Sequence, residues 1–155
     1  MEMPKLTEHH QKLKALVGTW NGEEVMPPSP WNPEASKRTS RTDARLDLGN
    51  FFLIMEYVQK SGAQETYRGH GVYGWDPRKQ LYTMHWFDVM GGDPGAPALG
   101  TWEGNRLSFQ NQHHMGHSRY IYEFNGPNAY TFQLDSSQDG KNWMRFVEGK
   151  YQRVS

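Results

Sequence analysis

Three histidines close together in the sequence are the first residues whose types and spacing suggest chemistry. His113, His114 and His117 are neighbours, and imidazole is a common ligand of transition metals. Adjacent residues of a strand point to opposite faces, so His113 and His114 cannot bind one ion without a turn. Gly116 would permit such a turn, which would bring His114 and His117 together. No carboxylate lies in the cluster to complete a catalytic ligand set, so we expect hydrogen-bonded loop histidines and no metal.

Two further histidines lie inside segments rich in aromatic residues, where an imidazole could serve an interior site. His70 and His85, with Arg68 and Arg119, make up an alternative polar site for a haem protein or an enzyme. Ser, His and Asp all occur in the chain, but no nucleophile elbow or recognised acid–base pair surrounds them. The sequence therefore assigns no catalytic residue and no cofactor.

Two carboxylates interrupt hydrophobic stretches and are expected to be buried. These are Glu56 and Asp88. An unpaired buried carboxylate is costly, so we expect a base such as Arg68 or Arg119 beside them, in a structural rather than a proton-transfer role.

Charge and composition exclude several classes of protein. The 155 residues carry 17 Lys and Arg and 17 Asp and Glu, so the formal net charge is +0. Nucleic acids and anionic membranes are bound through a basic surplus, so neither partner is expected. The absence of cysteine excludes disulfides, thiolate catalysis and cysteine-ligated zinc. No apolar run approaches the roughly 18 residues of a membrane span or forms a signal peptide, so the expected location is the cytoplasm.

The elements that must position these residues begin with one short helix. Thr7 can cap it, Leu13, Leu16 and Val17 recur at helical spacing, and Gly18 offers a stop. The two histidines early in this segment are expected to face solvent.

Alternation with period two then dominates the chain, which predicts strands. Aromatic residues make up 14% of the chain and concentrate in these segments, and Gly, Pro, Asn and Asp lie between them. The expected strands cover Trp20 to Val25, Ser40 to Leu48, Phe51 to Val58, Glu65 to Trp75, Leu81 to Val89, Thr101 to Trp102, Arg106 to His113, Ser118 to Phe124, Tyr130 to Asp135 and Trp143 to Val154. Met26 to Pro33 and Gly91 to Pro97 are expected to be loops. No helix long enough for a parallel crossover separates the strands, so we expect an antiparallel all-β barrel of eight to ten strands forming one domain over residues 1–155.

One parity of these strands carries most of the large rings. Burial of each ring is worth about 1.5–3 kcal/mol, so this parity is expected to face inward. The expected lining residues are Tyr67, Tyr73, Tyr82, Met84, Trp86, Tyr120 and Tyr122. Gly69 and Gly71 on the same face would leave room beside the rings for a small hydrophobic or amphipathic ligand. The alternative is an interior that the same rings fill completely.

The segment Gly18-Thr19-Trp20 after a short helix, with Arg153 near the end, resembles the calycin signature of lipocalins and fatty-acid-binding proteins. The resemblance implies that Trp20 lies across the floor of a barrel and that Arg153 stacks on it, closing one end.

A closer resemblance covers nearly the whole chain. The motifs that carry it are Gly18-Thr19-Trp20-Asn21-Gly22, Leu46-Asp47-Leu48-Gly49-x-Phe51, Arg68-Gly69-His70-Gly71-Val72-Tyr73-Gly74-Trp75-Asp76, Trp86-Phe87-Asp88, Gly100-Thr101-Trp102-Glu103-Gly104, Arg119-Tyr120-x-Tyr122 and Glu148-Gly149-x-Tyr151. In these motifs the chain resembles the bacterial family called domain of unknown function 1579. The resemblance implies a calycin-like barrel and carries over no catalytic residue.

The expected function is therefore binding of a small hydrophobic or amphipathic molecule inside the barrel, without catalysis. A haem-binding or enzymatic barrel that uses an interior histidine is the alternative. The haem-binding nitrobindins also carry Gly-Thr-Trp, but they ligate iron through a histidine near their C-terminal strands, and the last histidine here is His117. An interaction module without a ligand, including a homodimer formed through the loops, is the third alternative.

Overall fold

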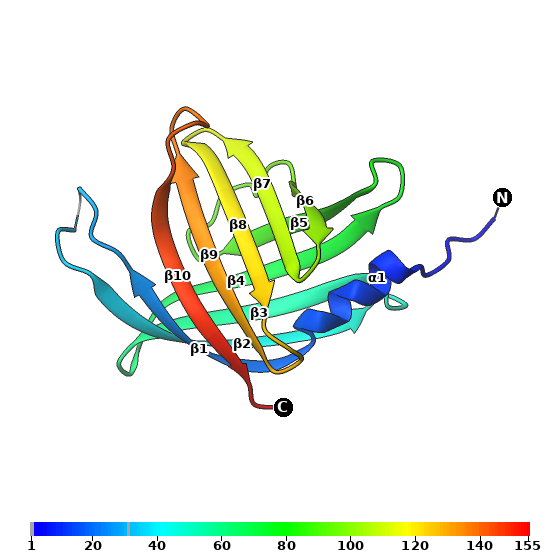
Figure 1. The fold of residues 1–155 in the computed structure, drawn as a ribbon, viewed down its shortest axis with the longest axis horizontal. Helices are drawn as coiled ribbons and strands as arrows, with labels where there is room; N and C mark the ends of the chain where they lie inside the picture. The colour runs from blue at the N-terminus through cyan, green and yellow to red at the C-terminus, as the bar shows by residue number, and fades with distance from the viewer. Residues whose placement is uncertain (1, 31) are drawn as a thin grey trace.

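In the computed structural model, ten antiparallel strands close into one barrel (Figure 1). The structure describes residues 2–30 and 32–155, so Trp31 in the proline-rich segment lies outside the described residues. Each strand pairs with its neighbours in sequence, and β1 pairs with β10 to close the sheet. The strands are β1 (Gly18–Met26), β2 (Ser36–Asp47), β3 (Phe52–Ser61), β4 (Gln64–Asp76), β5 (Leu81–Asp88), β6 (Ala98–Glu103), β7 (Arg106–His113), β8 (Gly116–Phe124), β9 (Ala129–Ser137) and β10 (Met144–Arg153). The all-β antiparallel barrel expected from the sequence is confirmed.

Toward one end of the barrel several ladders stop before their strands end, including those between β1 and β10 and between β5 and β6. The ladder between β1 and β10 runs from Trp20 opposite Arg153 to Val25 opposite Glu148. The ladder between β5 and β6 ends at Met84 opposite Ala98, although β5 continues to Asp88. This end, where the β1–β2, β3–β4, β5–β6, β7–β8 and β9–β10 connections lie, is the open end of the barrel, and the half of the barrel next to it is called the open half below.

A short helical segment lies at the opposite end (Figure 1). It consists of α1 (Glu8–Lys12) followed by a turn of 3₁₀ helix, Leu13–Leu16. Thr7 caps α1 by accepting a hydrogen bond from the His9 backbone N–H at 3.2 Å. The His10 side chain completes the cap, because its Nδ1 accepts from the Thr7 backbone N–H at 3.0 Å.

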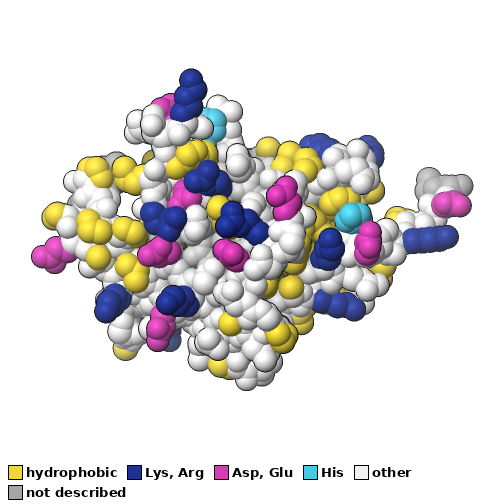
Figure 2. Space-filling view, in the orientation of Figure 1, with side chains coloured by type: hydrophobic (Ala, Val, Ile, Leu, Met, Phe, Trp, Pro, Cys, Tyr) yellow, Lys and Arg dark blue, Asp and Glu magenta, His cyan; other side chains and the backbone are white. Residues whose placement is uncertain are grey.

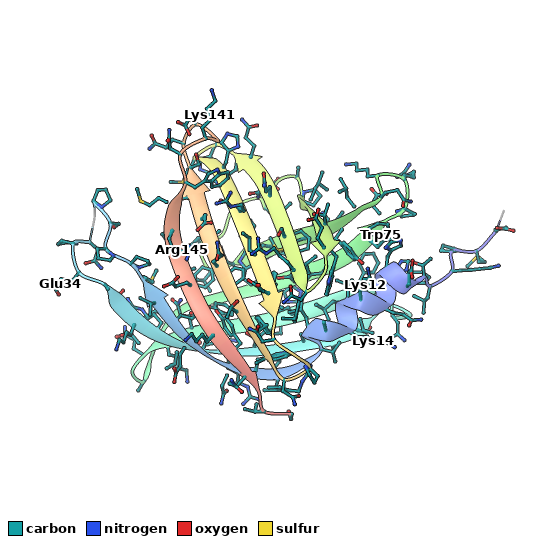
Figure 3. The ribbon with its side chains drawn as sticks, in the orientation of Figure 1. Lys12, Lys14, Glu34, Trp75, Lys141 and Arg145 are labelled. Carbon is teal, nitrogen blue, oxygen red and sulfur yellow. The ribbon has the colours of Figure 1, made fainter. Side chains whose placement is uncertain are left out.

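The two histidines of this segment do not face solvent, so that expectation was wrong. His10 is buried and its ring lies edge-on against Phe51. The His9 ring stacks on Trp75 with centroids 3.9 Å apart, and Figure 3 shows Trp75 beside α1. Both imidazole rings contact aromatic residues of the barrel because the helix packs across its closed end.

Trp20 forms the floor of the barrel at this closed end. It is fully buried with Leu13 and Leu16, and its indole N–H donates to the Leu16 carbonyl at 3.0 Å. The Arg153 guanidinium lies 4.3 Å from the centre of the Trp20 ring, so the pair expected from the sequence is in contact. Arg153 also donates to the carbonyl oxygens of Val17 and Pro127. The floor is therefore closed by a cation over an aromatic face, with its donors used by backbone acceptors.

The half of the barrel above this floor is packed with apolar and aromatic side chains. Burial alternates along the strands, as in β4, where Gly69, Gly71 and Tyr73 are buried and the residues between them are partly exposed. The buried core residues that come together include Leu53, Met55, Tyr73, Tyr82, Met84, Ala98, Leu107, Phe109, Tyr122, Tyr130 and Tyr151. The alternate strand positions that carry most of the aromatic rings therefore face the interior of the barrel, as expected from the sequence.

The outer surface is charged and mixed in sign. Figure 2 shows basic and acidic side chains interspersed over the visible face, in line with the balanced formal charge. Among the described residues, no helix is long and apolar enough to cross a membrane.

Replacement of Arg153 by Gln tests the closure of the floor. The change removes the cation–π contact and leaves the carbonyl oxygens of Val17 and Pro127 without their donor. We expect a loss of about 1–3 kcal/mol in the free energy of unfolding, measured by urea denaturation. Arg153→Lys keeps the charge without the planar fork, so it should recover only part of the loss. Wild-type stability of Arg153→Gln would contradict the closing role.

Candidate functional site

The open half of the barrel differs from the packed half because its inward side chains are polar as well as aromatic. Alternation along the strands brings these residues to the inner face from seven strands. They are Glu24, Arg38, Ser40, Tyr57, Gln59, Tyr67, Trp86, Asp88, Asn111 and Tyr120. Such a set can hold a polar group against an aromatic wall.

Glu24 is the central polar residue of the open half. It is only 2% exposed, and its carboxylate accepts hydrogen bonds from the Tyr57 hydroxyl at 2.6 and 2.7 Å and from Gln59 Nε2 at 2.8 Å. The Tyr151 hydroxyl donates to its other oxygen. Burial, reinforced by the charge of Glu24, raises the pKa of Tyr57 far above its ordinary value, so Tyr57 stays a donor. A buried carboxylate is thus satisfied by three neutral donors.

Two glycines allow the Tyr151 ring to lie flat along the inner wall and reach Glu24. A Cβ on Gly22 would lie 2.4 Å from the Tyr151 ring, and a Cβ on Gly149 would lie 2.6 Å from its hydroxyl oxygen. A side chain at either position would displace the tyrosine. These glycines therefore serve the polar network around Glu24.

A second carboxylate on the inner face is held in a similar way. Asp88 accepts a hydrogen bond from the Tyr67 hydroxyl at 2.6 Å, and the Trp86 indole N–H donates to the same hydroxyl oxygen at 2.7 Å. The Trp86 ring lies directly over Gly69 and Gly71, where added Cβ atoms would approach it to 2.2 and 3.0 Å. The room expected beside these glycines is therefore filled by Trp86, and that part of the expectation was wrong.

Three buried polar atoms on the inner face have no hydrogen-bond partner among the described residues. They are Arg38 Nε, Ser40 Oγ and Asn111 Oδ1. All three belong to inward positions of the open half. Buried polar groups in folded proteins nearly always have a hydrogen-bond partner, so three unpaired atoms on one face indicate that a partner outside the protein chain can bind there.

The expected lining residues divide between the two halves. Tyr73, Tyr82, Met84 and Tyr122 are buried in the packed half, where the hydroxyl oxygens of Tyr73 and Tyr122 lie 2.6 Å apart. The Tyr82 hydroxyl donates to the His9 carbonyl at 2.8 Å.

The other expected lining residues, Tyr67, Trp86 and Tyr120, are partly buried in the open half. Burial raises the pKa of both tyrosines. This second group belongs to the same half of the barrel as the unpaired atoms.

The alternative polar site does not exist as a cluster, because its members lie on the outer face. His70 and His85 alternate with the inward residues of β4 and β5, and His70 Nδ1 lies 2.5 Å from Glu56 Oε1 at the surface. Arg68, also outward, pairs with Glu65 at 2.7 Å. The rings of the opposite parity occupy the interior and exclude these side chains from it.

The buried carboxylates are also different from those expected. Glu56 is half exposed, whereas Asp135 on the outer face is 3% exposed beneath Arg119 and Arg145. Burial opposes ionisation of Asp135, but hydrogen bonds from Arg145 and Arg119 lower its pKa overall. The Arg119 guanidinium also lies 4.2 Å from the Trp143 ring. Arg119 therefore has a structural role on the outside of the sheet.

The histidines near the β7–β8 turn do not form a metal site. Within residues 2–30 and 32–155, no group of three or more His, Cys, Asp or Glu side chains is placed to hold an ion. His113 instead lies 2.9 Å from Ser118 Oγ and accepts from the Met115 backbone N–H.

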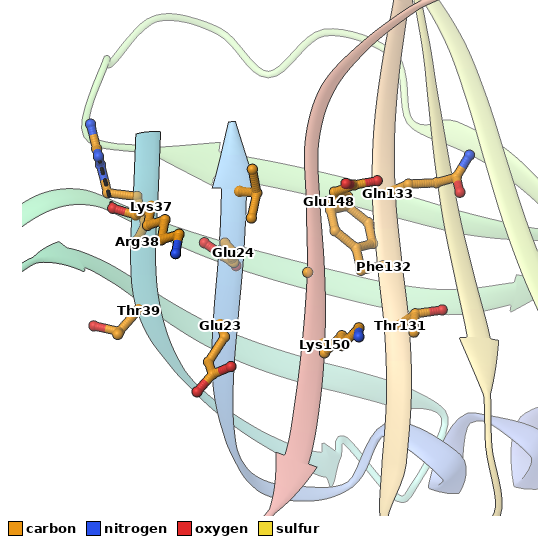
Figure 4. Close-up of a pocket in the computed structure, with 12 residues that line it drawn as sticks. Glu23, Glu24, Lys37, Arg38, Thr39, Thr131, Phe132, Gln133, Glu148 and Lys150 are labelled. Carbon is orange, nitrogen blue, oxygen red and sulfur yellow. Dashed lines mark hydrogen bonds between the residues drawn. The ribbon is translucent and has the colours of Figure 1, made fainter. Parts of the chain in front are cut away.

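A hollow of about 640 Å³ crosses the outer surface of β2, β1, β10 and β9 (Figure 4). Most of its lining residues are at outward positions, such as Glu23, Lys37 and Lys150, and the inward residues Glu24 and Arg38 line it as well. This hollow is a charged part of the sheet surface, and it shares Glu24 and Arg38 with the open half.

Sequence reasoning missed most of the polar residues of the open half. The alternation of side chains along a strand could have predicted some of these positions. Trp20 faces inward, so Gly22 and Glu24, two and four residues later on the same strand, face inward as well. Arg38 was missed because the strand was expected to begin at Ser40, whereas β2 begins at Ser36.

Comparison with known proteins identifies the family. The family model described as "Protein of unknown function (DUF1579)" matches residues 5–153. The chain belongs to this family. No curated protein sequence matches it.

Two solved structures show that this DUF1579 member has a calycin-like barrel fold. Rv2717c from M. tuberculosis superposes with a TM-score of 0.72 at 13% identity, covering 97% of this chain and 100% of that one. The S-type phycobiliprotein lyase CPES from Guillardia theta superposes with a TM-score of 0.70 at 10% identity, covering 98% and 99%. At these identities the likeness is one of fold alone.

Alkaline titration tests the burial of the tyrosine hydroxyls. Every one of the 8 tyrosines has a raised pKa, chiefly through burial, and that of Tyr82 is raised to about 12. The unfolded chain ionises its tyrosines near pH 10, so the stabilisation is complete below that pH and is lost as the pH rises further. We expect tyrosinate absorbance to appear in one cooperative step together with loss of circular dichroism. Gradual ionisation of several tyrosines near pH 10 in the folded protein would contradict the structure.

Proposed function

We propose that this protein binds a small amphipathic molecule in the open half of its barrel. The observation that carries the proposal is that Arg38 Nε, Ser40 Oγ and Asn111 Oδ1 are all buried, all unpaired and all on the inner face of that half. An unpaired buried polar group costs about 1–3 kcal/mol. A bound molecule with polar atoms would satisfy these groups and recover that cost.

The shape of the interior limits where such a molecule would lie. The Trp20 floor and the core above it are filled by packed side chains. The ligand would therefore occupy the open half, entering from the end where β5 and β6 and also β1 and β10 separate. It would be short rather than threaded through the whole barrel.

Aromatic rings would provide the apolar contact. Tyr57 lies edge-on to Tyr67 and to Trp86, with centroids 6.0 and 6.1 Å apart. The Tyr57 and Tyr67 hydroxyls donate to Glu24 and Asp88, and the Trp86 indole N–H donates to the Tyr67 hydroxyl, so the rings present their carbon surfaces. A ligand with a polar end and an apolar body matches this division.

The haem-binding and enzymatic alternative has less support. Its histidines, His70 and His85, lie on the outer face and cannot reach a group held inside the barrel. The likeness to a phycobiliprotein lyase is one of fold at 10% identity, so it supports the barrel as a scaffold and does not supply that activity.

A matched pair of variants tests the proposal. Ser40→Met fills the open half at an unpaired atom, and Thr39→Met places the same side chain on the exposed face of the same strand. Binding of decanol and of decanoate is measured by tryptophan fluorescence, and native mass spectrometry records any molecule that co-purifies.

We expect saturable binding of at least one probe to the wild type and to Thr39→Met. Ser40→Met should weaken binding by about tenfold or more, which corresponds to about 1.4 kcal/mol. Failure of both probes to bind the wild type, with no co-purified mass, would overturn the proposal. Equal binding to both variants would place the ligand elsewhere.

A further inference from the structure

The charges on the inner face of the open half are unequally satisfied. Among the residues that the structure describes, the charged side chains on this face are Glu24, Asp88 and Arg38. Both carboxylates already hold neutral donors, since Tyr57, Tyr151 and Gln59 serve Glu24 and a tyrosine hydroxyl serves Asp88. The guanidinium of Arg38, by contrast, has a donor, its Nε–H, that no acceptor among the described residues uses.

Arg38 faces Glu24 without pairing to it. The two residues lie directly opposite each other in the ladder between β1 and β2. Even so, no carboxylate in the described part of the chain lies within 4.0 Å of the Arg38 guanidinium nitrogens, because the Glu24 carboxylate is turned toward Tyr57 and Tyr151. Arg38 Nη1 donates to the Lys37 carbonyl at 3.0 Å, and its Nε is buried with no acceptor.

Ser40 provides a second unused donor on the same inner face. It lies two residues beyond Arg38 on β2, which is a separation of about 7 Å along a strand. Its side chain is deeply buried, with the residue 7% exposed, and its Oγ has no partner. A group with more than one oxygen could accept from Arg38 and Ser40 together.

Building on the proposed function, we propose that the polar end of the ligand is an anionic oxygen group, a carboxylate or a phosphate monoester, held by Arg38 Nε and Ser40 Oγ. A guanidinium N–H to an anionic oxygen is a charge-assisted hydrogen bond, about twice as strong as a neutral one. The Glu24 charge opposes the anion least when it stays bound to its three donors, which is the arrangement observed.

A cationic ligand fits the same residues poorly. It would have to displace a tyrosine hydroxyl from Glu24 or Asp88 and would leave Arg38 Nε unpaired beside a like charge. The apolar body of an anionic ligand would instead lie against Tyr57, Tyr67 and Trp86.

Four probes with the same ten-carbon chain and different ends test this inference. Decanoate and decyl phosphate carry anions, decanol is neutral, and decyltrimethylammonium is cationic. Dissociation constants are measured by isothermal titration calorimetry, below the concentrations at which the probes form micelles, for wild type, Arg38→Gln, Ser40→Ala and Lys37→Gln. Lys37→Gln is the matched control, because it removes an exposed positive charge from the opposite face of the same strand.

We expect the wild type to bind decanoate or decyl phosphate about tenfold or more tightly than decanol, and the cation more weakly still. Arg38→Gln should abolish the preference for the anion, Ser40→Ala should reduce it, and Lys37→Gln should retain it. Whichever anion binds more tightly identifies the head group.

Two outcomes would overturn the inference while leaving the proposed function intact. One is equal binding of decanol and the anions by the wild type, and the other is an anion preference that survives in a folded Arg38→Gln protein, checked by circular dichroism. Absence of binding by all four probes would instead contradict the proposed function itself.

Discussion

The arrangement of the open half depends on how one buried carboxylate is satisfied. Glu24 on β1 accepts from Tyr57 and Gln59 on β3 and from Tyr151 on β10, so a single acceptor ties three strands together on the inner face. A buried carboxylate with an arginine opposite it would be expected to form an ion pair. Because neutral donors serve Glu24 instead, the Nε–H of Arg38 is left without an acceptor among the described residues of the inner face.

The two halves of the barrel interior therefore differ in polarity: the half next to the floor is apolar, and the open half contains polar and charged side chains. Near the floor, the barrel is closed by Trp20, Arg153 and the helical segment. Their cation–π contact, apolar packing and hydrogen bonds to the backbone stabilise the folded barrel. Toward the open end, the same alternation of side chains places hydroxyl, amide and charged groups inside. There the unpaired buried atoms destabilise the fold, and hydrogen bonds to a bound molecule would offset that destabilisation.

The fold could be predicted from the sequence because it depends on patterns that a sequence displays. Alternation and turn residues indicated an antiparallel barrel, and the resemblance to calycins implied that Trp20 and Arg153 close it. The ring-rich set of alternate positions indicated which face lies inside. The site could not be predicted to the same extent. Trp86 fills the space over Gly69 and Gly71 on the neighbouring strand, and Glu24 pairs with tyrosines rather than with Arg38. Both facts depend on the direction that each side chain takes across the inner face, which alternation along a strand does not specify.

The Nε–Hε NMR resonance of Arg38 reports whether a bound anion accepts a hydrogen bond from this side chain. Nitrogen-15 NMR spectra of the arginine side chains, with Arg38 assigned through Arg38→Gln, would be recorded with and without decanoate. We predict that the Arg38 Nε–Hε signal moves strongly downfield and exchanges more slowly with water on saturation, while that of Arg153, already bound to backbone carbonyls, stays in place. A complex in which the Arg38 signal is unchanged, although decanoate is bound, would contradict it.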